Sequence, residues 1–397
     1  MTETVLLVLP NPLHSAYKSV ASNPPEGYSY VAEHHDVMER SSNSSVQAGT
    51  RLLYEEGGLN SALIFLRDSF LLARERVTSL TKSSGACLVF SLTRYTAFTQ
   101  VPTILYQEYV SPWAATGRAM QRTLYMQKSI KRILASTPTY VSTYLSIMSE
   151  KEVEERVDSL IIGVPLPPAF VRPESDGSNL LFVSSGNYAQ DEGYAYAAFA
   201  TRGGIDVLRS FRILNKQYGD RVRLTMRSYI PKEVKQEFAD VLKLPNMTVH
   251  EEVLPRSKLQ EIYAASDIFL FPAYRGITMT IGEAFGYGLP VVGADSWDMP
   301  DIVTDKVNGL LRTRDDRGTP LIRNHVPFWD FRVLVRASAD EDFLKSYTEA
   351  VSSLIDQKSY RRQLGSNAIR TVTDGHLSLP HMQRRLGRFF EEALARR

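Results

Sequence analysis

Short apolar runs recur along this chain, and amphipathic stretches separate them. Apolar runs of about four to eight residues that alternate with helical patterns are typical of parallel strands covered by helices on both faces. The alternation therefore predicts an α/β fold. The runs assigned to strands are 5–9, 86–90, 103–106, 180–184, 221–226, 268–272 and 290–294.

Two neighbouring segments rich in turn-forming residues interrupt this pattern most strongly. Residues 163–168 read GVPLPP, and residues 173–179 read PESDGSN. Clusters of Pro, Gly, Ser and Asn are typical of linkers. At about 150 residues per domain, a chain of 397 residues has room for two or three domains. We therefore predict an N-terminal domain over 1–168 and a C-terminal domain over 169–376.

Charge and cysteine content argue against several classes of protein. The 46 Lys and Arg residues and 44 Asp and Glu residues leave a net charge of +2, so composition gives no case for nucleic-acid binding. Cys87 is the only cysteine, which excludes a disulfide framework and a cysteine-based zinc site. No apolar run approaches the roughly 18 residues of a membrane span, and residues 1–9 lack the pattern of a signal peptide. We expect a cytoplasmic protein.

One segment, 116–135, has the pattern of a basic amphipathic helix. At about 100° per residue, most of its cations share one face and its apolar residues the other. Either the helix packs on the core with a solvated basic face, or this face contacts an acidic acceptor or the inner surface of an anionic membrane. The cations are Arg118, Arg122, Lys128, Lys131 and Arg132.

The stretch 250–311 carries the strongest functional signal. Residues 259–266 predict a helix, 268–271 a strand and 274–282 a loop, after which a helix begins near Glu283. Such a loop follows the carboxyl end of a parallel strand, where doubly wound sheets bind ligands. The helix N-terminus beside it suits a phosphate or diphosphate. Thr280 and Glu283 also fit a capping box, so a purely structural role is the alternative.

These residues resemble family 4 of the glycosyltransferases, which has the GT-B fold. The resemblance rests on Gly276 and on AASDIFLFP at 264–272, EA at 283–284, GLPVV at 288–292 and NGLL at 308–311. IIGVP at 161–165, GIDVL at 204–208 and YRRQLG at 360–365 also match family segments. The similarity extends over about 160–397.

The resemblance implies two Rossmann-like, doubly wound domains that face each other across a cleft. The C-terminal domain is expected to bind a nucleoside-diphosphate sugar, and the N-terminal domain an unidentified acceptor such as a glycan, a lipid-linked molecule or a natural product. The final helix, 377–397, is expected to pack back on the N-terminal domain. Retaining transfer of a hexose is implied, with side chains and helix dipoles stabilising the leaving group, so no metal or other cofactor is expected.

The family pattern also implies roles for individual residues. Glu283 matches the glutamate that holds the nucleotide ribose, while Arg275 stands where the family has a glutamate beside the donor sugar. An arginine there could instead bind a carboxylate or phosphate in bidentate fashion. Residues of the following loop, which offer N–H groups to the donor, complete the predicted site: Gly276, Ile277, Thr278, Met279 and Thr280.

The cations that neutralise the diphosphate in the family are only partly matched. The expected arginine is missing from the segment after strand 180–184, where Gly186 and Asn187 stand, and the expected lysine falls on Gly203. Arg202 and Arg227 are the nearest substitutes, besides Arg275.

Candidate acceptor-side and catalytic residues follow two N-terminal strands. His14 and Glu108 stand at expected carboxyl ends of strands, so either could contact the acceptor or act as a base, unless each is an ordinary loop residue. The pair His34 and His35 does not predict a metal site, because strand neighbours point to opposite faces. Two aromatic segments, 188–201 and 314–340, either form a lid or pack over the domain.

The departures at Arg275 and Gly203 leave two alternatives open. One is a catalytically inactive, glycosyltransferase-like binding or partner subunit. The other is a nucleotide-sugar epimerase on the same fold.

Overall fold

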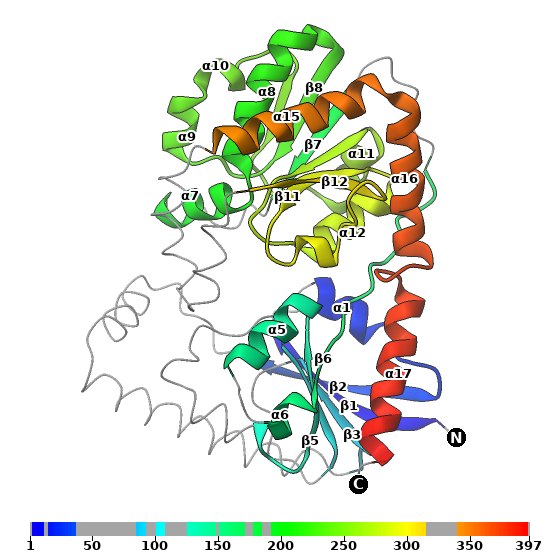
Figure 1. The fold of residues 1–397 in the computed structure, drawn as a ribbon. Coiled ribbons are helices and arrows are strands. Elements are labelled where there is room, and N and C mark those ends of the chain that lie inside the picture. Colours follow the sequence, from blue (N-terminus) through cyan, green and yellow to red (C-terminus); the bar gives the residue numbers. More distant parts are fainter. Residues whose placement is uncertain are drawn as a thin grey trace, which may run out of the picture. The chain divides into compact units, whose positions relative to one another are not determined.

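The computed structural model describes residues 2–11, 15–36, 85–92, 101–107, 125–147, 151–170, 178–184, 192–314 and 340–395. The chain divides into two compact units (Figure 1). Unit 1 comprises Met1–Gly163 and Leu379–Arg397, and unit 2 comprises Val164–Ser378.

Unit 1 is built on a parallel six-stranded sheet in the order β2-β1-β3-β4-β5-β6. The strands predicted at 5–9, 86–90 and 103–106 are confirmed as β1, β3 and β4. The strands are β1 Glu3–Asn11, β2 Tyr28–Asp36, β3 Leu88–Ser91, β4 Thr103–Gln107, β5 Ile130–Ala135 and β6 Val157–Ser159. The described helices are α1 Ser15–Ala21, α5 Pro138–Ile147, α6 Lys151–Glu154 and α17 Leu379–Ala395.

The predicted basic helix at 116–135 is wrong in its described part. Residues 130–135 form β5, which pairs in parallel with β4 and β6. Arg132 is held by Glu392 in an ion pair and donates a hydrogen bond of 3.0 Å to the Glu155 carbonyl. Its guanidinium therefore has a structural role within unit 1, and the helical face proposed for a membrane does not form here. Residues 108–124 lie outside the described part of the chain.

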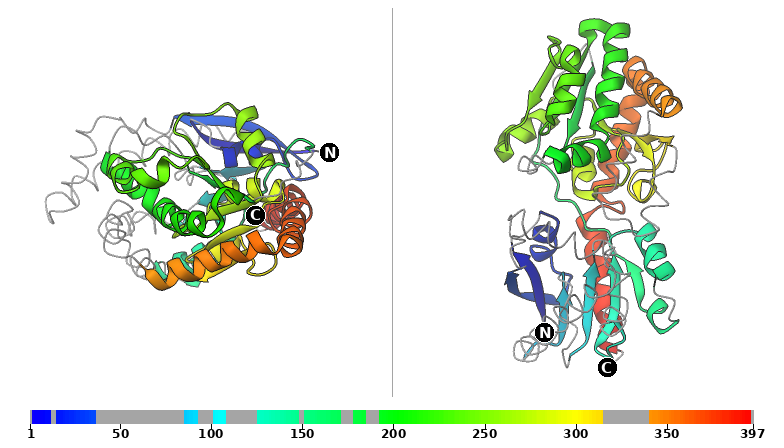
Figure 2. Two further views of the ribbon diagram at one scale, coloured as in Figure 1. Left: turned by 90° about the horizontal axis from the view of Figure 1, so that it is seen from above. Right: turned by 90° about the vertical axis from the view of Figure 1, so that its left-hand side faces the viewer.

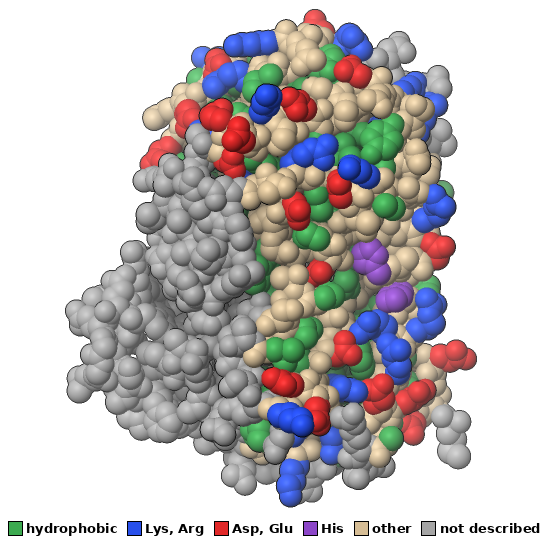
Figure 3. Space-filling model, in the orientation of Figure 1, with side chains coloured by type: hydrophobic (Ala, Val, Ile, Leu, Met, Phe, Trp, Pro, Cys, Tyr) green, Lys and Arg blue, Asp and Glu red, His purple; other side chains and the backbone are tan. Residues whose placement is uncertain are grey.

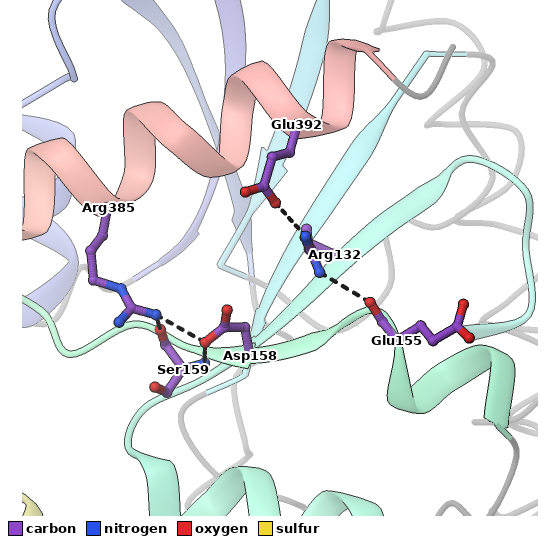
Figure 4. Close-up of polar contacts among 6 residues, drawn as sticks. All are labelled: Arg132, Glu155, Asp158, Ser159, Arg385 and Glu392. Atoms are coloured by element: carbon purple, nitrogen blue, oxygen red, sulfur yellow. Dashed lines mark hydrogen bonds and ion pairs between the residues drawn. The ribbon is translucent and has the colours of Figure 1, made fainter.

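Helix α17 joins the sheet of unit 1 from the far end of the sequence (red in Figures 1 and 2). Phe390 is fully buried, and its ring packs edge-on against Tyr28 and Phe90 at centroid distances of 5.1 and 5.6 Å. Arg385 donates hydrogen bonds of 2.9 Å to the Asp158 carboxylate and the Ser159 carbonyl (Figure 4). Apolar packing and ion pairs thus fix the same helix.

Unit 2 also contains a parallel six-stranded sheet, in the order β12-β11-β10-β7-β8-β9. The strands predicted at 180–184, 221–226, 268–272 and 290–294 are confirmed as β7, β8, β10 and β11. The strands are β7 Ser178–Val183, β8 Val222–Arg227, β9 Met247–His250, β10 Ile268–Phe271, β11 Val291–Asp295 and β12 Gly309–Thr313. The described helices are α7 Glu192–Thr201, α8 Gly204–Tyr218, α9 Lys232–Glu237, α10 Ala239–Leu242, α11 Arg256–Ala264, α12 Thr278–Gly286, α15 Glu341–Asp356 and α16 Lys358–Thr373, with short 3₁₀ turns at Gly219–Arg221 and Met299–Asp301.

Both faces of the central strand β10 are buried, which explains why it is continuously apolar. In β10, Ile268 and Leu270 join the core formed with α8 and α15. The alternate residue Phe269 packs on the opposite face against Tyr263 of α11, at a ring distance of 6.1 Å. The strand order changes direction between β7 and β10, so these two strands flank the topological switch point where ligands bind in open α/β sheets.

Candidate functional site

The loop between β10 and α12 lies at this switch point and is held by polar contacts from several other segments. The Tyr274 N–H donates to the Thr201 carbonyl at 3.0 Å, and the Tyr274 carbonyl accepts from the Ser296 hydroxyl at 3.0 Å. At the start of the loop, Arg314 donates to the Pro272 carbonyl at 2.9 Å. We call residues 272–277 the switch loop. Its backbone is fixed even though it belongs to neither the strand nor the helix.

Helix α12 begins earlier than the sequence predicted. It starts at Thr278, and its N-cap residue is Ile277, whose side chain has no polar atom. Thr280 is therefore inside the first turn, so the predicted capping box with Glu283 does not form. The first N–H groups of an α-helix have no intrahelical partner. Ile277, Thr278, Met279 and Thr280 are thus brought together at a helix N-terminus that suits an anion, and Gly276 directly precedes them.

Glycines allow α12 to pack closely on the segment that enters unit 2. A Cβ on Gly282 would lie 2.4 Å from Val164 Cγ2, and one on Gly286 would lie 2.7 Å from Pro167 Cδ. Both distances are shorter than real contacts allow. Gly282 and Gly286 therefore permit close helix packing, and this packing fixes the direction of α12 within the unit.

Glu283 lies on the second turn of α12 and faces α11. Its side chain is only 17% exposed and forms an ion pair with Arg256, which stands at the start of α11 and is 64% exposed. Burial raises the pKa of Glu283 above its usual value, while the nearby Arg256 charge and Tyr263 hydroxyl oppose that rise. The carboxylate is therefore partly desolvated, and its cationic partner is a long, largely exposed side chain. Nothing in this arrangement requires Glu283 for the start of the helix.

Asp298 is a site residue that the sequence pattern did not indicate. It follows β11, the neighbour of β10, and is only 3% exposed. Its Oδ1 accepts a hydrogen bond of 2.7 Å from the Gly276 N–H. Burial raises the pKa of Asp298 to about 6, although the Arg275 charge and the Gly276 N–H both lower it. The sequence held one signal for Asp298: it follows the predicted strand 290–294, so it was expected at the same sheet edge as the switch loop.

The predicted cations gather around the carboxyl ends of three adjacent strands. Arg275 lies in the switch loop after β10. Arg227 ends β8 and donates a hydrogen bond of 2.8 Å to the Ser184 carbonyl, at the end of β7. Arg202 is half-buried and directly precedes Gly203, whose backbone contacts Pro272. The structure thus brings these three arginines to one edge of the sheet.

The backbone conformation and close packing at Gly203 explain why no lysine stands at this position. Its φ is +81°, and a Cβ there would lie 2.4 Å from the Pro272 carbonyl oxygen. Neither the backbone nor the space accepts a side chain. Arg314 is a further buried cation close by: it pairs with Asp206 and lies 4.1 Å from the ring centre of Tyr274. From the sequence, Arg314 was only the start of an aromatic segment.

Several predicted residues lie outside the described part of the chain. They include the two catalytic candidates of unit 1, His14 and Glu108, and the two residues predicted after β7, Gly186 and Asn187. Most of the aromatic segment 314–340 also lies there. The other aromatic segment is described from residue 192 onward. There Phe199 is buried and packs on Phe182 at a ring distance of 6.0 Å, so this side chain contributes to the core.

The described residues add three observations about metals, membranes and surface charge. They contain no cluster of three or more His, Cys, Asp or Glu side chains that could hold a metal ion. Within the same residues, no helix combines the length and the apolar character needed to cross a membrane. On the described part of the face in Figure 3, basic and acidic side chains are interspersed.

The sequence of unit 2 matches a known family over the segment that builds this site. Residues 197–322 match the family described as Glycosyl transferases group 1. This segment includes the switch loop, α12, Glu283 and Asp298. No curated protein sequence gave a significant match.

Solved structures with the same fold are similar along nearly the whole chain. A glycosyltransferase from Rickettsia africae gives a TM-score of 0.58 at 12% identity, over 99% of both chains. Anabaena HepE in complex with UDP gives 0.59 at 11%, over 98% of this chain and 100% of that one, and in complex with UDP-glucose 0.53 at 12%, over 98% and 99%. WaaG, a glycosyltransferase involved in lipopolysaccharide biosynthesis, gives 0.56 at 13%, over 96% and 99%.

The chain therefore has a two-domain α/β fold of the GT-B type. At these identities the structural similarity shows the fold alone. The group 1 match within that fold supports a glycosyltransferase.

Proposed function

We propose that this protein transfers a sugar from a nucleoside-diphosphate donor to an acceptor. The observation that carries the proposal is a coincidence of position: the group 1 match at 197–322 covers the switch loop, the N-terminus of α12 and the arginines at the same sheet edge. The groups that we propose to bind the diphosphate thus lie within the segment that matches the family. The UDP and UDP-glucose complexes of Anabaena HepE, a protein of the same fold, support a nucleotide sugar as the donor.

The side chains of unit 2 suggest how the donor is held. The N–H groups at the start of α12, together with Arg275, Arg227 and Arg202, would neutralise the diphosphate. Glu283 would accept hydrogen bonds from the ribose hydroxyls. These groups supply positive charge without a metal ion, so we propose metal-independent transfer.

For the chemical step we propose retention of configuration. The bond between the anomeric carbon and the diphosphate oxygen breaks, and the acceptor oxygen bonds to the anomeric carbon on the same face. The acceptor proton passes to the leaving diphosphate. His14 and Glu108 stay predictions for acceptor contact, and a hexose stays the predicted sugar. The acceptor classes remain a glycan, a lipid-linked molecule or a natural product.

A thermal-shift panel tests the donor part of this proposal. The panel contains uridine, guanosine, adenosine and thymidine diphosphates and their common sugar conjugates. A ligand at about 100 times its dissociation constant stabilises the folded state by roughly 2.7 kcal/mol, which such a measurement resolves. We expect one base to give a shift. If no member of the panel changes the midpoint, an ordinary donor site is excluded.

A catalytically inactive partner subunit is the second candidate, because Arg275 and Gly203 depart from the family pattern. Incubation with a donor radiolabelled in the sugar separates it from an enzyme. A transferase releases the label to an acceptor or to water, whereas an inactive subunit that binds the donor leaves it intact. An epimerase would change the sugar while the sugar stays attached to the nucleotide.

Reversing the charge at Arg275 should impair sugar release strongly. In an Arg275→Glu variant the new carboxylate would face the buried Asp298, and one cation near the diphosphate would be lost. We expect release of labelled sugar to fall on the order of a hundredfold, because charge stabilisation of a leaving group has effects of this size. Arg275→Lys is the matched control and should retain more activity. Faster release from UDP-glucose in Arg275→Glu would contradict the assigned role.

A further inference from the structure

We propose that Asp298 is a positioning residue of the donor site: its carboxylate fixes the backbone of Gly276 beside Arg275, and so holds the switch loop ready for the donor. This inference rests on the proposed function, because it assigns the switch loop to donor binding. Asp298 lies 22 residues after Gly276, the loop residue that it contacts.

The contact between Asp298 and Gly276 is fixed from two sides. Asp298 Oδ1 accepts from the Gly276 N–H at 2.7 Å. On the other side, a Cβ added to Gly276 would lie 2.4 Å from Ile302 Cδ1, so the backbone here touches the Ile302 side chain closely. Asp298 and Ile302 belong to the same segment after β11. That segment therefore holds the switch loop at Gly276, the residue next to Arg275.

The backbone around Asp298 is itself unusual. Trp297 has a φ of +49°, in the left-handed region that bulky side chains rarely adopt. Such conformations persist where surrounding contacts determine them, and they concentrate at functional sites. Here the Ser296 hydroxyl bonds to the Tyr274 carbonyl at 3.0 Å, and the Met299 N–H donates to the Ser296 carbonyl at 3.0 Å. The turn that presents Asp298 is thus tied to the switch loop on both sides of Trp297.

Asp298 is also an unfavourable choice for a purely structural anchor. Burial raises its pKa to about 6; Arg275 opposes this rise, while the neighbouring Asp301 adds to it. His376 in turn lies near Asp301. Because the folded-state pKa of Asp298 is above 3.8, its contribution to stability is present at acidic pH and is lost as the pH rises through about 6. Near neutral pH the ionised carboxylate has lost this contribution.

The test compares three variants of the full-length protein. Asp298→Asn keeps the shape and an acceptor oxygen but removes the charge, whereas Asp298→Ala removes both. Asp295→Asn is the matched control, because Asp295 ends β11 just before the turn that carries Asp298 and is exposed. We measure UDP affinity by calorimetry between pH 5 and 8, and hydrogen exchange of the peptide 272–282 in the protein without nucleotide.

We expect Asp298→Ala to bind UDP about tenfold more weakly than wild type at pH 7.5, because the Gly276 N–H loses the acceptor that positions the switch loop. Asp298→Asn keeps an acceptor oxygen, so it should retain most of the wild-type affinity. Its affinity should also depend less steeply on pH around 6 than that of wild type or Asp295→Asn. In Asp298→Ala the peptide 272–282 should exchange faster, because the Gly276 N–H has lost its acceptor. If Asp298→Ala does not fold, the pH dependence of Asp298→Asn still decides.

Two results would overturn the inference. One is an Asp298→Asn variant with the pH dependence of wild type, or a folded Asp298→Ala variant with the UDP affinity of wild type. The other is unchanged exchange of 272–282 in folded Asp298→Ala. If wild type itself binds none of the nucleoside diphosphates, the proposed function fails, and the role of Asp298 in the donor site fails with it. The exchange measurement would then decide only whether Asp298 fixes the loop.

Discussion

In a Glu283→Ala variant, the thermal shift produced by the preferred nucleoside diphosphate should disappear. If the carboxylate holds the ribose, the variant loses hydrogen bonds to a charged group, each worth about 1.5 to 3 kcal/mol. Affinity should therefore fall on the order of a hundredfold, as measured by calorimetry on the wild-type and variant proteins. Helix α12 should still form in this variant, because the carboxylate caps no helix.

Stability separates this role of Glu283 from a structural one. Burial raises the pKa of Glu283 above 4.5, so its favourable contribution is lost as the pH rises through that raised value. At neutral pH, Glu283→Gln should therefore unfold at a temperature no lower than wild type. Glu261→Ala is the control, because Glu261 is exposed on α11 and pairs with Lys258. Nucleotide binding unchanged in Glu283→Ala would show that its pairing with Arg256 is its whole role.

Gly203→Ala should lower the stability of the fold more than substitutions at Glu283, Arg275 or Asp298 do. The new side chain would hold a φ of +81° and place its Cβ 2.4 Å from the Pro272 carbonyl oxygen. The left-handed backbone alone costs about 1 to 2 kcal/mol, and the clash brings the expected total to roughly 3 kcal/mol or more. Because Pro272 begins the switch loop, nucleotide affinity should fall as well. Calorimetric unfolding with and without the nucleotide measures both effects.

Gly27 offers a matched control for the backbone component. Its φ is +82°, and a Cβ there would meet no atom within 4 Å. The free energy of unfolding of Gly27→Ala should therefore fall only by the cost of the left-handed backbone, about 1 to 2 kcal/mol. If Gly203→Ala and Gly27→Ala lose the same stability, Pro272 must move away from the new Cβ at little cost. In that case the close approach at Gly203 would not explain why a lysine is missing there.

Central strands of both units such as β3, β4 and β10 could be predicted from the sequence because they are largely apolar and fully buried. In β10 every residue from Ile268 to Phe271 is buried, and helices cover both faces. The edge strand β9 was not predicted, because its residues are only partly buried and include Thr248 and His250. Its pairing with β8 gives it a place in the sheet that its composition does not reveal.

The segment 130–135 shows how a tertiary contact can override a helical pattern. Lys131 and Arg132 lie at positions that a helical period places on one basic face. In the structure the backbone pairs with β4 and β6, and Glu392 of α17 neutralises Arg132. A partner 260 residues away in the sequence leaves no trace in the local pattern. Periodicity alone therefore favoured the wrong element.

The site was predictable where its signal is contiguous in sequence. The place of the switch loop and of Glu283 followed from a strand, a loop and a helix in succession, although the helix starts at Thr278 and not near Glu283. Asp298 and Arg314 were missed because each acts on the loop through a contact with a distant segment. A single Asp or Arg beyond a strand is common, and only burial and a defined partner distinguish these two.

The return of α17 to unit 1 has a consequence for synthesis of the chain. Unit 1 consists of Met1–Gly163 and Leu379–Arg397, so unit 2 is complete before the ribosome has made the last part of unit 1. Until then Phe90 and Tyr28 lack the Phe390 ring that covers them. The N-terminal sheet therefore lacks the packing of α17 until residues 379–397 have been made, whereas domains usually fold in order from the N-terminus.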